Sequence, residues 1–311
     1  MQKTFHPIRL ALLACILLIF VVFSARAQDP AQPGQPSQTQ VESEQPSAQP
    51  SDFTFAVFGD NRPGLPSLTQ PKIFKTILKD ILKENPCFVV NTGDSVFGSS
   101  NIGKLQKQYA KYLENIKILS PIKVYLTLGN HEISGSKSNQ AFFAKEFGAL
   151  YYSFDRGDSH FIILNTEVVG EAGRIAGKQL EWLKEDLKKS KNARHKFIFV
   201  HRPMYPVSSH IGDSLDSRPK ERDALHSLFV QNRITAVIAG HEHLFDQQIK
   251  HGVRYIITGG AGAPLYTSRD KTGYFNHYIL VSIKGDKVDF KVIKPAMNGK
   301  PREVLPPEEA G

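Results

Sequence analysis

Short apolar runs recur from residue 53 onward and alternate with amphipathic segments. Each run is four to six residues long, is rich in Val, Ile and Phe, and ends at a Gly or a polar cluster, which predicts strands buried on both faces. The amphipathic segments keep their apolar residues on one stripe, which predicts helices. The predicted strands are Phe53–Phe58, Phe88–Asn91, Val124–Leu128, Phe161–Asn165, Phe197–Val200, Ala236–Ala239 and Tyr255–Thr258, and the predicted helices are Lys72–Lys83, Lys104–Leu119, Gln179–Lys189 and Lys220–Asn232.

Strands and helices that alternate in this way predict an α/β fold. Near the C-terminus the alternation stops, and Asn276–Ile283 and Lys287–Ile293 predict an antiparallel hairpin across a Lys-Gly-Asp turn. We therefore expect one domain over residues 53–300. Residues 301–311 contain a Pro-Pro-Glu-Glu run and are expected to form a flexible tail.

The first 52 residues predict targeting and linking segments rather than a folded part. Residues 1–27 combine a basic start, fourteen uncharged residues from Leu10 to Phe23 and the small-x-small sequence Ala25-Arg26-Ala27, the layout of a signal peptide. A spanning helix needs about 20 apolar residues, so we expect a secreted or periplasmic protein without a stable membrane span after cleavage. The alternative is anchoring by an uncleaved N-terminal segment. Residues 28–52 are rich in Gln, Pro and Ser and predict a disordered linker.

Potential metal ligands follow five of the predicted strands, most of them beside a Gly. In open α/β sheets, ligands bind outside the carboxyl ends of the strands, and Gly lets the chain turn sharply there. These residues therefore predict a metal site at one edge of the sheet. The candidates are Asp60, Asp94, Asn130, His201, His241 and His243.

The ligand types narrow the kind of metal. The chain has only two cysteines, Cys15 and Cys87, which excludes a disulfide framework and an all-thiolate zinc site. A set of two Asp, one Asn and three His suits Mn, Fe or Zn, and two ions rather than one. Two ions about 3.5–4 Å apart can clamp a phosphate and activate a hydroxide that bridges them.

The charge distribution favours an anionic partner. The formal net charge is +9, of which residues 1–27 carry +3 and residues 28–52 carry −4, leaving +10 for residues 53–311. A basic domain suits an anionic substrate, an anionic surface or nucleic acid, but the sequence lacks the aromatic and basic pattern that would favour nucleic acid. We expect a phosphorylated small molecule or a polyanion as substrate, and nothing in the sequence indicates an obligate protein partner.

The ordered blocks around these ligands resemble the calcineurin-like metallophosphoesterases, which include the purple acid phosphatases. The blocks are Gly-Asp at 59–60, Gly-Asp at 93–94, Gly-Asn-His-Glu at 129–132, His201 and Gly-His-Glu-His at 240–243, and the resemblance covers about residues 53–265. It implies a four-layer α/β sandwich in which two mixed β-sheets pack together and helices flank both outer faces.

The resemblance also implies a role for each residue. Metal 1 would be held by Asp60 and His243, Asp94 would bridge both ions, and metal 2 would be held by Asn130, His201 and His241. His131 would lie over the phosphate, where it would steady the transition state or protonate the leaving oxygen. Glu132 and Glu242, which neighbour ligands, are expected to support the ligands or to face solvent.

Two positions depart from the family pattern. Most members carry His two residues after the first Asp, where this chain has Arg62, and purple acid phosphatases carry Tyr three residues after the bridging Asp, where it has Phe97. Metal 1 would thus lack one protein ligand. A guanidinium binds phosphate with two parallel hydrogen bonds, so Arg62 is a candidate for catalysis and substrate binding. His210, in a polar loop after His201, is a further candidate for substrate binding.

Three functions remain open from the sequence. The first is a secreted metal-dependent phosphoesterase that hydrolyses a phosphate mono- or diester through a hydroxide between the ions. The second is a phosphate-binding protein that has lost catalysis on the same scaffold. The third is a serine esterase, because residues 212–215 spell Gly-Asp-Ser-Leu.

Overall fold

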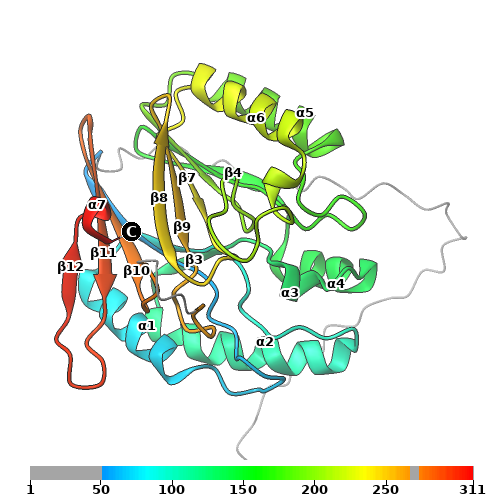
Figure 1. Cartoon of the computed structure of the whole chain (residues 1–311), viewed down its shortest axis with the longest axis vertical. Helices are drawn as coiled ribbons and strands as arrows, with labels where there is room; N and C mark the ends of the chain where they lie inside the picture. The colour runs from blue at the N-terminus through cyan, green and yellow to red at the C-terminus, as the bar shows by residue number, and fades with distance from the viewer. Residues whose placement is uncertain (1–50, 267–272, 311) are drawn as a thin grey trace, which may run out of the picture. The chain divides into compact units, whose positions relative to one another are not determined.

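Two β-sheets form the centre of the computed structural model, which describes residues 51–266 and 273–310 (Figure 1). The first sheet has the strand order β12-β11-β10-β1-β2-β3. Its strands β1, β2 and β3 are parallel neighbours, whereas β10 pairs antiparallel with both β1 and β11, so the sheet is mixed. Its strands are β1 (Phe53–Phe58), β2 (Phe88–Asn91), β3 (Lys123–Leu126), β10 (Tyr278–Lys284), β11 (Lys287–Lys294) and β12 (Glu303–Leu305).

The second sheet has the order β4-β5-β6-β7-β9-β8. Its four central strands run parallel, and an antiparallel strand closes each edge. The strands are β4 (Tyr152–Arg156), β5 (Ser159–Ile163), β6 (His195–Phe199), β7 (Ala236–Ala239), β8 (Phe245–Lys250) and β9 (Val253–Thr258).

Helices cover the outer face of each sheet. Apolar residues of α1 and α2 pack on the first sheet, and those of α5 and α6 pack on the second. The layers are therefore helices, sheet, sheet and helices, which confirms the predicted four-layer α/β sandwich. The helices are α1 (Lys72–Glu84), α2 (Ile102–Ile116), α3 (Asn130–Ile133), α4 (Lys137–Phe147), α5 (Gly177–Lys189), α6 (Pro219–Gln231) and α7 (Pro307–Ala310), with short 3₁₀ turns η1 (Lys117–Leu119) and η2 (Leu215–Ser217).

Side-chain alternation along β1 explains how one strand serves two cores. Phe55 points into the space between the sheets, where its ring stacks on Phe88 at 5.0 Å and meets the edge of Phe161 at 5.4 Å. Its neighbour Ala56 and, two residues later, Phe58 point to the opposite face and pack beneath α1. Because successive side chains of a strand face opposite sides, a continuous apolar run is required, which is the pattern that the sequence shows.

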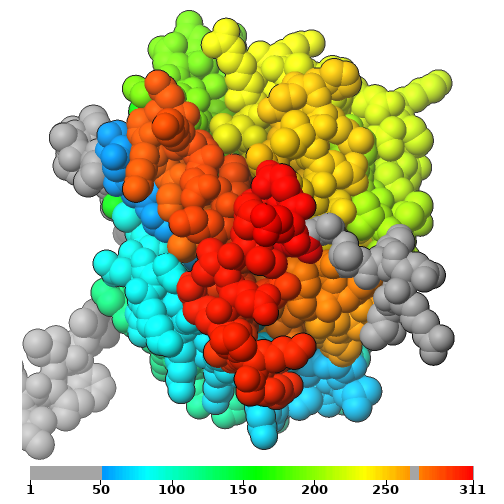
Figure 2. Space-filling view, turned by 60° about the vertical axis from the view of Figure 1, so that its left-hand side comes forward, coloured from blue at the N-terminus to red at the C-terminus, as the bar shows by residue number. Residues whose placement is uncertain are grey.

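Several elements were not predicted from the sequence. The edge strands β4 and β8 and the helix α4 have many partly exposed polar residues, so they lack a continuous apolar run. The C-terminus also differs from the expected flexible tail. There β12 pairs with β11, and the following helix α7 buries Ala310 and brings Glu308 to Arg254, on β9 of the second sheet. In Figure 2 the red C-terminal segment lies against the orange and yellow surface.

The predicted signal peptide and most of the predicted linker, residues 1–50, lie outside the described residues. Within the described part, no helix combines the length and apolar character needed to cross a membrane.

Candidate metal centre

The six predicted ligands converge from both sheets. Asp60, Asp94 and Asn130 follow β1, β2 and β3 of the first sheet, so that sheet supplies the oxygen ligands. The imidazoles come from the second sheet, with His201 just after β6 and the pair at 241 and 243 after β7. The carboxyl ends of the two sets of strands therefore meet at one place, as the sequence predicts.

The oxygen ligands of the first sheet and the imidazoles of the second lie within a few ångströms of one another. His201 Nε2 lies 2.9 Å from Asn130 Oδ1, 3.1 Å from His241 Nδ1 and 3.4 Å from Asp94 Oδ1. Ligand atoms of Asp60, Asp94 and His201 all lie within 4.8 Å of one another. On the other side of the group, His243 Nε2 lies 3.6 Å from Asp60 Oδ1. These nitrogens and oxygens thus face a common centre.

Three of the predicted ligands have strained backbone conformations that the surrounding structure maintains. Asp60, Asp94 and His241 all have left-handed backbone conformations, with φ of 58°, 55° and 72°. Such conformations are costly for residues other than Gly and are concentrated at functional sites. Close approach also requires glycine, because a Cβ at Gly129 would lie 2.3 Å from Asp94 Oδ1.

The electrostatics call for a cation at this centre. Asp60 and Asp94 are almost completely buried, and Asp60 Oδ1 has no hydrogen-bond partner. Burial raises the pKa of Asp60, and the neighbouring Asp94 carboxylate raises it further. Burial alone would raise the pKa of Asp94 too, but the charges of His201, His131 and Arg62 outweigh it and hold this pKa well below its usual range. Two adjacent buried carboxylates are expensive without a compensating cation, so the donor set fits one or more metal ions.

The histidines are in the form that binds metal. Burial lowers the pKa of His201 and His243 to about 4 and that of His241 to about 3, so all three are neutral at pH 7. The Nδ1–H groups of His201 and His243 donate to the carbonyls of Thr92 and Pro264, at 2.9 and 2.7 Å. These bonds leave each Nε2 as the free acceptor toward the centre. The sequence offers no indication of these two partners.

His131 and Arg62 flank Asp94 and are more exposed than the ligands. His131 Nε2 lies 3.8 Å from Asp94 Oδ2, and Arg62 Nε lies 3.4 Å from the same oxygen. Their side chains are 23% and 15% exposed, against 2% for Asp94. The Nδ1–H of His131 donates to the carbonyl of Phe97 at 2.5 Å. Both side chains can therefore reach a group that approaches from solvent.

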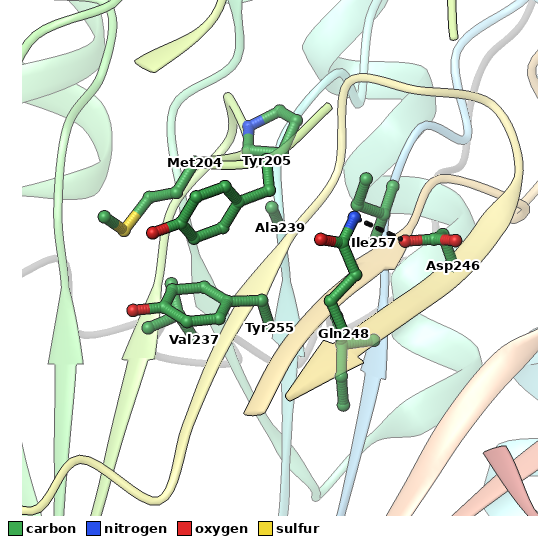
Figure 3. A pocket seen from close by; sticks show the side chains of 10 residues that line it. Met204, Tyr205, Val237, Ala239, Asp246, Gln248, Tyr255 and Ile257 are labelled. Carbon is green, nitrogen blue, oxygen red and sulfur yellow. Dashed lines mark hydrogen bonds between the residues drawn. The ribbon is translucent and has the colours of Figure 1, made fainter. Parts of the chain in front are cut away.

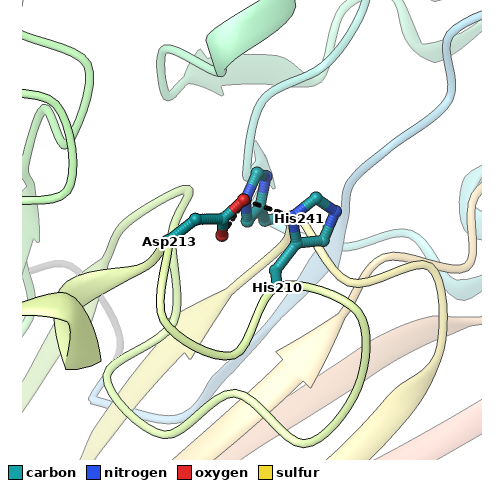
Figure 4. Close-up of side chains that lie close together, drawn as sticks. All are labelled: His210, Asp213 and His241. Carbon is teal, nitrogen blue, oxygen red and sulfur yellow. Dashed lines mark hydrogen bonds and ion pairs between the residues drawn. The ribbon is translucent and has the colours of Figure 1, made fainter.

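A loop after β6 brings His210 and Asp213 beside His241 (Figure 4). The ring of His210 lies 3.8 Å from the ring of His241, and its Nε2 lies 2.7 Å from the hydroxyl of Tyr266. Asp213 joins the two histidines, because its carboxylate lies 2.9 Å from His210 Nδ1 and 3.4 Å from His241 Nε2. With Nε2 of His241 donating to Asp213, its Nδ1 is left to face His201 and the centre. Asp213 and Tyr266 were not predicted as site residues.

Two buried glutamates fix the loops around the ligands. Glu132 accepts hydrogen bonds from the backbone N–H groups of Asp94, Ser95 and Gly129 at 2.6 to 2.9 Å. In the same way Glu242 accepts from Val207 and Ser208 at 2.7 and 2.6 Å, at the start of the loop that carries His210. Neither glutamate faces solvent, since both are at most 2% exposed.

An unpredicted ion pair borders the centre. Arg202 forms two hydrogen bonds with the buried Glu167, at 2.8 and 3.1 Å, and donates to the carbonyl of Asp213 at 2.6 Å. Its Nη1 lies 3.4 Å from His241 Nε2. Arg202 thus ties the loop that contains Asp213 to the metal-ligand cluster. The two residues are 35 positions apart in sequence, so no local pattern reveals the pair.

The serine esterase motif at residues 212–215 has no partner in the next histidine along the chain, His226. Ser214 Oγ bonds only weakly to Asp213 at 3.4 Å, while the ring nitrogens of His226 bond to Tyr255 and His251, so Ser214 and His226 form no Ser–His pair. A cavity of about 10 Å³ lies between Met204, Tyr205 and strands β7 to β9 (Figure 3). It has room for a single water molecule at most and is too small for a substrate.

Comparisons with known proteins agree with this geometry. Residues 53–245 match the family model of calcineurin-like phosphoesterase. The chain is 38% identical over 100 residues to the probable inactive purple acid phosphatase 9 of Arabidopsis thaliana, covering 32% of this chain and 15% of that protein. It is 26% identical over 196 residues to the serine/threonine-protein phosphatase CPPED1 of Bos taurus, covering 60% of this chain and 62% of that protein.

A solved structure supports the fold. The purple acid phosphatase PPD1 from yellow lupin (Lupinus luteus) seeds superposes with a TM-score of 0.61 at 17% identity, covering 85% of this chain and 53% of that one. The chain spans less than two thirds of the length of both curated relatives.

Proposed function

Because the chain belongs to the calcineurin-like phosphoesterase family, we propose that it is a metal-dependent hydrolase of phosphate mono- or diesters. The observation that carries the proposal is the convergence of buried oxygen ligands from one sheet with neutral imidazoles from the other. The unpartnered Oδ1 of Asp60 is part of that group and supports a cation at the centre.

The residues would divide between two ions as the resemblance implies. Asp60 and His243 would hold one ion, Asn130, His201 and His241 would hold the other, and Asp94 would contribute to both. When bound, two such ions supply Lewis acidity to a phosphoryl oxygen and lower the pKa of water. The mixed oxygen and imidazole set suits Mn, Fe or Zn.

Three side chains would act on the substrate directly. Arg62 donates N–H groups to a phosphate oxygen and offsets the charge that develops there. His131, whose Nδ1–H is fixed on the Phe97 carbonyl, would present Nε2 to the substrate, to steady the transition state or to protonate the leaving oxygen. His210 has both ring nitrogens engaged, Nδ1 by Asp213 and Nε2 by the hydroxyl of Tyr266, so it would bind a phosphate oxygen by exchanging the Tyr266 contact.

Activity against three chromogenic esters tests the proposal. We expect the protein to hydrolyse p-nitrophenyl phosphate or bis-p-nitrophenyl phosphate, to lose this activity after chelation and to regain it with Mn, Fe or Zn. Activity on p-nitrophenyl acetate alone that resists a chelator would instead support the serine esterase. The ratio of the two phosphate activities would assign the enzyme as a mono- or diesterase.

Loss of catalysis with retained phosphate binding is the second candidate. Arg62 and Phe97 stand where most of the family and the purple acid phosphatases have a metal ligand, and one relative is named as probably inactive. Calorimetry with inorganic phosphate separates the candidates, because this one predicts metal-dependent binding without turnover of any of the three esters.

We further propose that the chain is exported. The layout of residues 1–27 supports a signal peptide, residues 28–52 support a linker, and the catalytic domain starts at residue 53. N-terminal sequencing of the mature protein tests this proposal, and a start at Gln28 is expected. An intact N-terminus in the membrane fraction would favour an uncleaved anchor.

A further inference from the structure

The outer face of α1 and α2 is predominantly basic. The two helices cover the same face of the first sheet, and the start of α1 meets the end of α2, where Phe74 stacks on Tyr112 at 6.2 Å. Both helices lie along the bottom of the view in Figure 1. Their solvent side, with the adjoining turn η1, exposes eight lysines, which we call the lysine face. Its members are Lys72, Lys75, Lys79, Lys83, Lys104, Lys107, Lys111 and Lys117.

The spacing of these lysines places them in two neighbouring stripes. Those of α1 follow one another at intervals of three and four residues, as do the first three of α2, so each set occupies one side of its helix. The stripes approach each other where Phe74 of α1 stacks on Tyr112 of α2 and where η1 packs against α1. Near this junction a hydrogen bond from Lys111 and the charges of Lys75 and Lys117 lower the pKa of Glu114. The lysine face therefore spans both helices.

Few acids offset this charge. Arg302 binds both Asp80 and Glu84 on α1, and Glu114 on α2 is paired with Lys111 at 2.9 Å. The helices of the second sheet differ, because α5 and α6 interleave acidic and basic residues along their length. A large part of the positive charge of residues 53–311 is thus gathered on one side of the first sheet.

We infer that the lysine face docks on a bilayer surface that contains anionic phospholipids. Each lysine near such a surface raises the partition coefficient about fivefold, and eight together provide strong attraction at low salt. Leu82, 40% exposed and one turn from Lys79, adds an apolar contact among the charges. Lysine is a compact point charge on a flexible stem, which suits the mobile headgroups of a membrane.

Nucleic acid fits this face less well. Proteins that bind single strands interleave basic residues with aromatic platforms on which bases stack. Within α1 and α2, both fully described, no arginine occurs, and the aromatic residues Phe74, Tyr109 and Tyr112 are buried.

Cosedimentation of the full chain with vesicles tests the inference. Phosphatidylcholine vesicles report any binding through the N-terminal apolar segment, and vesicles with about 30% phosphatidylglycerol add the anionic surface. We expect the anionic vesicles to bind the protein more tightly and to lose this advantage at about 0.5 M NaCl. A variant with Lys75, Lys79, Lys107 and Lys111 changed to Gln should lose at least about 100-fold in partitioning, down to the level of neutral vesicles.

A matched variant makes the result decisive. Lys178, Lys184, Lys188 and Lys189 of α5 are also exposed, and changing them to Gln removes the same net charge from another face. This control should keep most of the anionic binding, and both variants should keep the melting temperature and esterase rate of the wild type. Equal losses of vesicle binding in both variants would overturn the inference, because binding would then depend on the net charge of the protein and not on the lysine face.

Two other results would also overturn it. One is equal binding of the wild-type protein to neutral and anionic vesicles. The other is a loss of single-stranded DNA binding, measured by anisotropy, in the α1–α2 variant without any loss of vesicle binding. That outcome would make nucleic acid the partner of the lysine face.

Discussion

Arg62 stands where most of the family has a metal-ligating His, and its contacts allow a quantitative prediction. Its Nε lies 3.4 Å from Asp94 Oδ2, and its Nη1 donates to the carbonyl of Pro63 at 3.2 Å. A guanidinium has five N–H donors, so these two contacts leave others for a phosphate oxygen. The side chain is 15% exposed, which makes its hydrogen bonds stronger than those of a fully solvated arginine.

We expect Arg62→Ala to weaken phosphate binding and to leave metal binding intact. Loss of one charge-assisted hydrogen bond costs about 1.5–3 kcal/mol, or about 10- to 150-fold. KM for p-nitrophenyl phosphate and the inhibition constant for inorganic phosphate should both rise by this factor. Metal content should not fall, because the change removes a positive charge from beside Asp94. Steady-state kinetics and elemental analysis measure these quantities, and Arg62→Lys, which keeps the charge without the planar fork, should lose less.

A second substitution separates substrate binding from metal binding. Arg62→His restores the family's imidazole two residues after Asp60 and should tighten the ion held by Asp60 and His243. An Arg62→Ala protein with unchanged KM and phosphate inhibition would refute the substrate role and make Arg62 structural. If Arg62→His gained no metal affinity, an imidazole at position 62 would be unable to reach the ion proposed at Asp60 and His243.

Three further changes test other parts of the site and fold. Asp94→Ala should lower metal affinity more than about 100-fold in a metal titration, whereas Ser214→Ala should keep both metal and rate. If Ser214→Ala lost the hydrolysis rate and Asp94→Ala kept it, the serine esterase would replace the phosphoesterase as the proposed function. His131→Ala should retain metal by elemental analysis but lose about 10²- to 10⁴-fold in rate, with a smaller loss for esters with good leaving groups, and loss of metal would mean that His131 is a ligand. His160, buried between two aspartates that raise its pKa to about 9, stabilises the fold fully below about pH 6.5, and this stabilisation is lost as the pH rises through about 9. His160→Gln should therefore lower the free energy of unfolding by about 2 kcal/mol at pH 6 and by much less at pH 10, and an equal effect in denaturant titrations at both pH values would contradict the assignment.

The sequence predicts the central strands and the residues that follow them for the same physical reason. A strand buried on both faces must be apolar throughout, so Asp60, Asp94 and His201 are conspicuous where such runs end. The edge strands β4 and β8 are covered on fewer sides and tolerate polar residues, such as the two glutamines of β8, so they give no comparable pattern. The helix α4 could not be predicted from an apolar stripe, because it buries only two of its residues, Asn139 and Phe143.

The residues that orient the predicted ligands could not be predicted from the sequence, because their contacts join segments that are far apart along the chain. His201 is fixed by the carbonyl of Thr92, 109 residues earlier in the chain. Asp213 belongs to a stretch that spells a serine esterase motif, yet its carboxylate orients His241 and His210. Glu132 and Glu242 are the exceptions, since their places beside predicted ligands indicate either support of the ligands or exposure to solvent, and their backbone hydrogen bonds specify support.

The division of the proposed ligands between the sheets would link metal binding to stability. Asp60 and Asp94 follow strands of one sheet and the three imidazoles follow strands of the other, so an ion held by both groups joins the sheets at one edge. In the same molecule, the contacts of the Phe55 ring with Phe161 and Phe197 of the second sheet hold the sheets together through the core. A ligand that binds only the folded state stabilises it by about 2.7 kcal/mol at a concentration 100 times its dissociation constant. Chelation should therefore lower the melting temperature of the wild-type protein and have little effect on Asp94→Ala. Identical melting curves with and without metal for the wild-type protein would mean that the six residues do not hold an ion between the sheets.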